Sequence, residues 1–468
     1  MRSYNIVGIQ QVGIGTEDMV KSWKWYADMF QMNVRMLEDD TVAELMLPYT
    51  GNKPQRRHAC IAANLQGGGG FEIWQYSERK PQPISFDIQI GDLGIFIAKI
   101  KSHNIAAYHE ELTQKYRDIT PIFTDPRGLP TFYIHDPAGN CFQVVEDNYI
   151  FIDENRYSGG IVGAMIGVSD IDKSLPVYQD IFGYDTILYD KNGTFSDWHT
   201  LRGGEQHYRR VLLGRSTPHT GPFAGLYGSG TIELVQALDR TPRKIYEGRY
   251  WGDPGFIQIC FDVVNMRELE KYCQEKGYPF TVDSCANQSQ FDMGLAAGHF
   301  TYIEDPDGTL IEMVEIHKIP IINKPNISIN LMKRDRSKQL PTLLFRMMKL
   351  NKVKFKDNGY SYQSHQGGRP LRGGPQSVYE LRYVHSRVPG GGVLRLRPPA
   401  HLRHRATRQR SRHREVAPLR HHLVLRTVYV LQAPLPARQR PGRDHQRAPQ
   451  DFPAVRLFPR QRDGPPAD

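Results

Sequence analysis

Three glutamates lie near the start of an expected strand, directly after a tight turn. Glu72 follows four glycines in GGGGFEIWQ, and Glu233 holds the same place in GSGTIELVQ. Glu312 follows an Asp-Pro-Asp-Gly turn, in which proline fixes φ and glycine takes a positive φ. Carboxylates on neighbouring strands could bind a hard divalent cation or transfer protons. The alternative interpretation is that they are solvated residues at the edges of sheets.

Several other classes of site find no support in the sequence. The five cysteines form no CxxC pair, which argues against a disulfide framework and a zinc site built from such pairs. The four glycines before Glu72 lead into a strand, not into a helix, so they do not predict a phosphate-binding loop. The N-terminus lacks the basic start and apolar stretch of a signal peptide. We therefore expect a cytoplasmic protein in a reducing compartment, with no membrane span.

The first 317 residues repeat themselves. GIGTEDMVKSWKWYADMF and GVSDIDKSLPVYQDIFG each place an acidic cap before an amphipathic helix. FYIHDPAGNCFQVVED and TYIEDPDGTLIEMVE each place an Asp-Pro turn between two strands. The repeats predict four modules, each made of a strand, a helix and three strands (βαβββ). Their expected boundaries are 1–80, 81–150, 158–240 and 248–318.

A single module of this kind leaves the concave face of its sheet uncovered. Two modules must pair to close that face, and the enclosed groove is the natural place for a ligand. The expected fold is therefore α+β, with four modules paired into two cup-shaped sheets.

The module pattern resembles the vicinal oxygen chelate superfamily, which includes glyoxalase I, extradiol dioxygenases and the bleomycin-resistance proteins. The resemblance covers residues 5–317, and its most specific parts are GDPGF at 252–256 and the Asp-Pro-Asp-Gly-x-x-Ile-Glu ending at 305–312. It implies glyoxalase-like cups. It does not by itself select one chemistry, because one fold can host several.

The resemblance also implies which residues would hold a metal. Enzymes of this superfamily can offer two ligands per module, one on the first strand and one near the start of the last strand. In module order, these positions are Gln11 and Glu72, Ile97 and Gln143, Gly163 and Glu233, and Gln258 and Glu312.

The way the modules pair decides which of these positions meet. Sequential pairing, as in the dioxygenases, would leave both grooves incomplete and would place Glu233 with Gln258 and Glu312. Crossed pairing, as in tandem glyoxalases, joins modules 1 and 4 and unites Gln11, Glu72, Gln258 and Glu312. We favour crossed pairing because it gathers the intact positions in one groove.

Four oxygen ligands, two of them anionic, suit Mg²⁺, Mn²⁺ or Ni²⁺, with Zn²⁺ as a further candidate. None of the eight positions is a histidine, which counts against an iron site that activates oxygen. The resemblance then implies a glyoxalase-like lyase or isomerase that acts beside a carbonyl of a small molecule through an enediolate. Glu312 is the first candidate for the base and Glu72 the second. The alternative is a metal-free small-molecule binding protein of the bleomycin-resistance type.

The composition of the chain changes after residue 356. Residues 361–468 contain 21 arginines and no lysine against six acidic residues, whereas residues 1–360 hold 39 basic and 44 acidic residues. We expect residues 357–468 to be a disordered Arg/Pro-rich tail. The abrupt change favours coding sequence read out of frame over an arginine-rich nucleic-acid arm. Residues 319–356 are expected to be a basic linker with one helix near Thr342–Lys352, and the mildly acidic body is not expected to bind nucleic acid.

Overall fold

The computed structural model describes residues 3–285, 291–292, 297–322 and 327–355. Four modules follow one another along the chain, and each begins with a strand and a helix and continues with further strands. The tail beyond residue 355, including the segment predicted to be disordered, lies outside the described residues. Within the described residues, no helix combines the length and apolar character that a membrane span requires.

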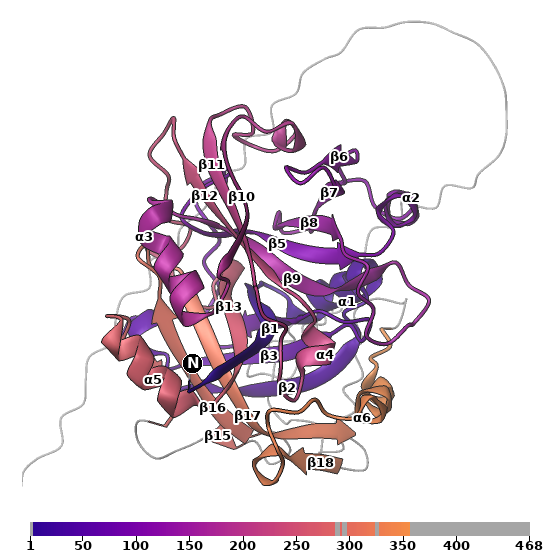
Figure 1. Ribbon diagram of the computed structural model, residues 1–468, viewed down its shortest axis with the longest axis vertical. Coiled ribbons are helices and arrows are strands. Elements are labelled where there is room, and N and C mark those ends of the chain that lie inside the picture. The colour runs from indigo at the N-terminus through magenta and orange to yellow at the C-terminus, as the bar shows by residue number, and fades with distance from the viewer. Residues whose placement is uncertain (1–2, 286–290, 293–296, 323–326, 356–468) are drawn as a thin grey trace, which may run out of the picture. The chain divides into compact units, whose positions relative to one another are not determined.

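Modules 1 and 4 build the first sheet, which we call the first cup. Module 1 contributes β1 (Asn5–Gly15), α1 (Met19–Phe30), β2 (Val34–Ala43), β3 (Gln55–Ala63) and β4 (Gly70–Tyr76). Module 4 contributes β13 (Gly255–Val264), α5 (Met266–Glu275), β14 (Val282–Asp283), β15 (Phe291–Asp292), β16 (Ala297–Glu304) and β17 (Leu310–Ile322). The strand order β14-β16-β17-β13-β1-β4-β3-β2 places β1 directly beside β13, as Figure 1 shows.

Modules 2 and 3 build the second sheet, the second cup. Module 2 contributes β5 (Gly94–Ser102), α2 (Ile105–Thr113), β6 (Phe123–Thr124), β7 (Pro130–His135) and β8 (Cys141–Glu146). Module 3 contributes β9 (Ser158–Gly167), α3 (Ile171–Pro176) with a π-helical turn (Val177–Ile181), β10 (Thr186–Gly193), β11 (Tyr208–Gly214), α4 (Ala224–Tyr227) and β12 (Thr231–Ala237). The strand order β10-β11-β12-β9-β5-β8-β7-β6 shows that the modules of both sheets pair in the crossed manner.

Side-chain caps start the first helix of three modules. Asp18, Asn104 and Asp170 each accept a hydrogen bond from a backbone N–H of the first helical turn, which otherwise has no partner. The first and last of these caps are the acidic residues expected from the repeat. Each helix therefore begins directly after the first strand of its module and can fold back on that sheet.

The helices pack with the faces of both sheets that point away from the cups. One hydrophobic core joins residues of β1, β4, β13 and β17 with residues of β5, β8 and β9 and with all four module helices. Tyr26 of α1 donates a hydrogen bond to Asp136 (2.6 Å), and Tyr178 of the π-helical turn donates one to Asp305 (2.9 Å). Both aspartates belong to Asp-Pro turns. Consecutive modules are thus joined through a helix and a turn, whereas crossed modules share a sheet.

The segment after the fourth module is more structured than the linker expected from the sequence. Strand β17 continues to Ile322 and pairs with β18 (Ile327–Asn330). The expected helix begins at Thr342 as α6 (Thr342–Met347) and continues as a 3-10 turn to Asn351. Phe345 and Met348 are fully buried in a second core that also contains residues of the first strands. Apolar side chains of this segment belong to that core. The amino-acid composition of the segment did not predict that they would be buried.

Candidate functional site

Four polar side chains meet at the centre of the first cup, and we call them the polar cluster: Gln11, Glu72, Gln258 and Glu312. Gln11 Nε2 donates to Glu72 Oε2 (3.2 Å) and to Glu312 Oε2 (3.3 Å). Gln258 Nε2 donates to the same two atoms, at 2.8 and 3.4 Å. Each carboxylate therefore accepts from both amides. These are the four positions that crossed pairing was expected to unite.

The register of four adjacent strands brings the cluster together. In β1 and β13, Gln11 lies opposite Cys260, and in β13 and β17, Cys260 lies opposite Glu312. In β1 and β4, Gly13 lies opposite Glu72. Because side chains alternate between the faces of a strand, these positions all point into the cup.

Gly13 leaves the room that the cluster needs. A Cβ atom at this position would lie 2.5 Å from the side-chain amide carbon of Gln258. Any larger residue at position 13 would therefore require the side-chain amide of Gln258 to shift.

Burial makes the two carboxylates unusual acids. Gln11, Gln258 and Glu312 are 2%, 0% and 6% exposed, whereas Glu72 is only partly buried. Burial and the nearby charge of Glu312 raise the pKa of the Glu72 carboxyl to about 8. Burial also raises the pKa of the Glu312 carboxyl. In the protein alone, Glu72 therefore retains a proton near neutral pH.

The donor set fits a hard divalent cation. Gln11 Oε1 and Gln258 Oε1 are buried atoms without a hydrogen-bond partner in the part of the chain that the structure describes. A half-turn of each amide would exchange its nitrogen for this oxygen and present four oxygens to one point. Oxygen atoms of two carboxylates and two amides are ligands that Mg²⁺, Mn²⁺ and Ni²⁺ accept.

An apolar pocket of about 100 Å³ opens beside the polar cluster on the same face of the sheet. Ile61 on its wall lies directly opposite Glu72, and Val314 follows two residues after Glu312. Leu37, Ala63 and Ile316 complete the apolar wall, and Gln10 and Tyr227 are among its polar residues. The cluster residues themselves do not line the pocket, and Ile61 and Val314 are the wall residues next to Glu72 and Glu312 in the strand register.

Aromatic side chains cover the other side of the cluster. Met46, Trp74, Trp251 and Tyr302 are buried together, and the ring centroids of Trp74 and Trp251 lie 4.1 Å apart. These buried side chains lower the local dielectric constant, which strengthens the electrostatic interactions of the carboxylates.

The second cup has the same strand plan but no such cluster. Its four corresponding positions are Ile97, Gln143, Gly163 and Glu233, so Glu233 is its one carboxylate among them. The structure therefore does not bring Glu233 to Gln258 and Glu312, because these residues lie in different sheets.

Two buried cations neutralise Glu233. Lys99 forms an ion pair with Glu233 Oε2, and Arg210 Nε donates to Glu233 Oε1 at 2.7 Å. Tyr189 donates to the same oxygen at 2.6 Å, and Arg210 also pairs with the buried Asp197 at 2.9 Å. Burial alone would raise the pKa of the Glu233 carboxyl, but the charges of Arg210 and Lys99 lower it to about 2.

Sequence reasoning did not identify Lys99 and Arg210. The available signal was a lysine inside the apolar strand GIFIAKIKS and an arginine before the apolar run VLLG. A charged side chain in such a strand needs a buried partner of opposite charge. The partner itself, Glu233, is 134 residues away from Lys99.

No protein-family model matches the sequence, and no curated protein matches it. Solved structures similar to the chain include glyoxalase I from Zea mays, which is 14% identical, with a TM-score of 0.42 over 67% of this chain and 92% of that chain. A variant of 4-hydroxymandelate synthase from Streptomyces coelicolor is 10% identical, with a TM-score of 0.23 over 68% and 93% of the chains. A glyoxylase/bleomycin resistance protein/dioxygenase domain from Frankia sp. EAN1pec is 19% identical, with a TM-score of 0.21 over 32% and 91%.

Proposed function

We propose that this protein is a metal-dependent lyase or isomerase that acts beside a carbonyl group of a small molecule. One observation carries the proposal: two protonatable carboxyls and two buried amides converge beside an apolar pocket in the first cup. The second cup, in which Lys99 and Arg210 neutralise Glu233, has no part in the reaction.

Gln11, Glu72, Gln258 and Glu312 would hold the metal. A bound divalent ion acts as a Lewis acid that polarises the substrate carbonyl and thereby acidifies the adjacent C–H bond. The protein supplies the rest. It fixes the ligands on central strands of one sheet and keeps the site dry on the side of Trp74 and Trp251.

Glu312 and Glu72 are the proposed proton-transfer pair. A carboxylate in this low-dielectric site holds a proton more strongly than one in water, so it is a better base toward a C–H bond. In a lyase or isomerase of this type, the proton leaves the carbon beside the carbonyl and is then delivered to an acceptor atom of the same molecule. Glu72 is the more exposed of the two and lies beside the pocket wall at Ile61, whereas Glu312 is held deeper.

The pocket beside Ile61 and Val314 would hold the apolar part of the substrate. Its position relative to the cluster orients the reacting carbon toward Glu72 and Glu312. Orientation of this kind raises the rate because the entropic cost of bringing the reacting groups together is met when the substrate binds.

A metal-free binding protein is the second candidate, and one observation favours it. The amide groups of Gln11 and Gln258 already donate to both carboxyls, and the raised pKa of the Glu72 carboxyl keeps a proton on it without a cation. Such a cluster would form the polar floor of a pocket for a neutral ligand.

Metal analysis of the full chain decides between the two candidates. The enzyme is expected to bind Mg²⁺, Mn²⁺, Ni²⁺ or Zn²⁺ at the polar cluster in the micromolar range and to bind one equivalent fewer when both Glu72 and Glu312 are replaced by glutamine. A screen of α-hydroxycarbonyl compounds and hemithioacetals should then reveal metal-dependent turnover. Metal-independent ligand binding without product would overturn the proposed reaction and support the binding protein.

A further inference from the structure

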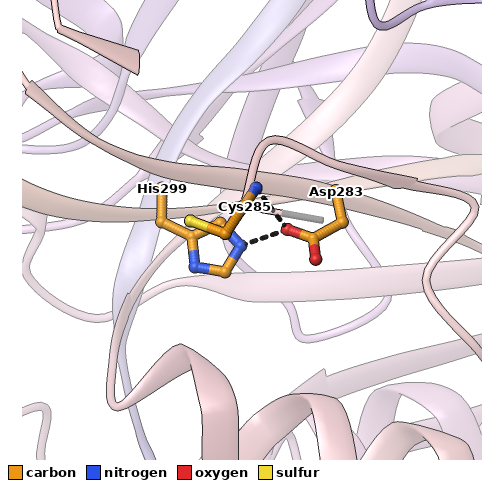
Figure 2. Close-up of side chains that lie close together, drawn as sticks. All are labelled: Asp283, Cys285 and His299. Carbon is orange, nitrogen blue, oxygen red and sulfur yellow. Dashed lines mark hydrogen bonds and ion pairs between the residues drawn. The ribbon is translucent and has the colours of Figure 1, made fainter. Parts of the chain in front are cut away.

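Three side chains with metal-binding atoms lie together at the edge of the first sheet, away from the polar cluster. They are Asp283, Cys285 and His299, and their ligand atoms all lie within 4.8 Å of one another. Figure 2 shows the imidazole of His299 facing the carboxylate of Asp283, with Cys285 beside both. We call these residues the edge triad.

Backbone pairing places the edge triad. In β14 and β16, Val282 lies opposite Tyr302 and Asp283 lies opposite Thr301. The ladder continues through Ser284, whose N–H donates to the carbonyl of Phe300 (3.0 Å) and whose hydroxyl accepts from the N–H of Phe300 (3.0 Å). Cys285 N also donates to Asp283 Oδ1 at 2.8 Å. The three residues are thus held close before any ion binds.

The edge triad lies on the opposite face of the sheet from the polar cluster. Tyr302 of β16 lies opposite Glu312 and shares its face, whereas His299 lies opposite Glu315. Strand residues an odd number apart point to opposite faces, so His299 points out of the cup. A metal at the edge triad would therefore be a separate ion from one in the cup.

His299 is buried against Asp283. His299 is 2% exposed, and its Nε2 lies 2.5 Å from Asp283 Oδ1. The charged side chains that act on this imidazole are Asp283, Arg267 and Glu315, and Arg267 Nη1 lies 3.5 Å from Asp283 Oδ2.

We propose that Asp283, Cys285 and His299 form a zinc site that fixes the edge strand β14 to β16. One sulfur, one nitrogen and one oxygen ligand suit a borderline ion such as Zn²⁺ and do not suit Mg²⁺. Three protein ligands leave the fourth tetrahedral position for water. Asp283 ends the two-residue strand β14, so a metal here would stabilise a part of the sheet that has few backbone hydrogen bonds of its own.

Cobalt titration of the metal-free full-length chain tests the proposal. Cobalt substitutes for zinc, and a thiolate ligand produces a near-ultraviolet charge-transfer band that oxygen ligands do not produce. We expect the band to appear with one equivalent of Co²⁺ and to disappear when Zn²⁺ is added. Cys285→Ser should abolish it, and His299→Gln should weaken Co²⁺ binding at least about a hundredfold.

Two variants make the test specific. Cys141→Ser removes a cysteine from the second cup and should leave the band unchanged. The Glu72→Gln/Glu312→Gln double variant should also keep the band, because it alters only the polar cluster. The proposal is overturned if no band forms at micromolar Co²⁺, if Cys285→Ser retains it, or if Cys260→Ser removes it instead. Far-ultraviolet circular dichroism of each variant separates ligand loss from misfolding.

Discussion

At the scale of single residues, the polar cluster is a pair of carboxyls whose protonation governs what it can bind. Glu72 and Glu312 share two amide donors and cannot both ionise easily without a cation between them. Metal binding and proton release should therefore be coupled in this protein.

Glu312→Gln tests the proposed proton transfer. The substitution keeps the shape and one ligand oxygen but removes the basic group, so turnover should fall by about two to four orders of magnitude. Metal affinity, measured by calorimetry, should fall less than in Glu72→Ala. Glu233→Gln is the matched control, because this residue holds the position of Glu72 in the second cup. Normal turnover by Glu312→Gln would contradict the proposed role of this residue.

The pH dependence of stability follows from Glu72. The pKa of this carboxyl is raised to about 8, so the folded metal-free protein keeps a proton that the unfolded chain releases near pH 4.5. The stabilising contribution is therefore fully present below about pH 4.5 and is lost as the pH rises through about 8. The melting temperature of the metal-free protein should fall over this range, and Glu72→Gln should flatten the decline. A matching decline in the variant would assign the effect to another group.

At the scale of elements, the two cups share one arrangement of strands but differ in the polar side chains at their centres. The first cup collects four ligand atoms at one point, whereas the second cup places Lys99 and Arg210 beside its single matching carboxylate. The second cup thus contains its own cations and has no need of a metal ion.

Lys99→Met should destabilise the second cup. The substitution leaves Glu233 and Asp197 with one buried cation between them, and breaking a buried ion pair on one side costs about 3–5 kcal/mol. Denaturant unfolding measures this loss. Adding Glu233→Gln to Lys99→Met should recover part of it, because the second change removes the unpaired charge. Equal stability of the single variant and the native chain would show that the network contributes little.

Gly13→Ala tests the packing of the first cup. The added Cβ atom would lie 2.5 Å from the amide carbon of Gln258, so the amide must move and metal affinity should fall. Shortening the neighbour in Gly13→Ala/Gln258→Ala should restore the melting temperature without restoring metal affinity. Unchanged metal binding in Gly13→Ala would place the ion away from Gln258.

At the scale of the whole molecule, four modules and the following segment share their cores. The helices of all modules lie in one core between the sheets, and residues 319–355 add a second core against the first strands. The module boundaries expected from the sequence therefore do not mark units that pack independently.

Truncation at Phe355 or at Lys318 tests whether residues 319–355 contribute to the stability of the fold. A chain that ends at Phe355 should keep the melting temperature of the described fold. A chain that ends at Lys318 loses the buried side chains of Leu331, Phe345 and Met348 and should melt at a lower temperature. Thermal unfolding compares the two chains. Equal melting temperatures would show that the second core is dispensable.

The sequence alone was sufficient to predict the four βαβββ modules. It also placed Glu72 and Glu312 near the start of the last strand of modules 1 and 4. Local signals carry this information, because caps, Asp-Pro turns and glycine-rich turns act within a few residues. The repeats then make each local signal visible twice.

Only the tertiary structure decided which strands became neighbours. The β1–β13 pairing joins segments about 250 residues apart, and the sequence favoured it over the sequential alternative only through the ligand positions that it would gather. The neutralisation of Glu233 and the core formed by residues 319–355 depend on the same long-range contacts. Such contacts arise from the burial of matching faces, so they become visible only when the complete chain is folded.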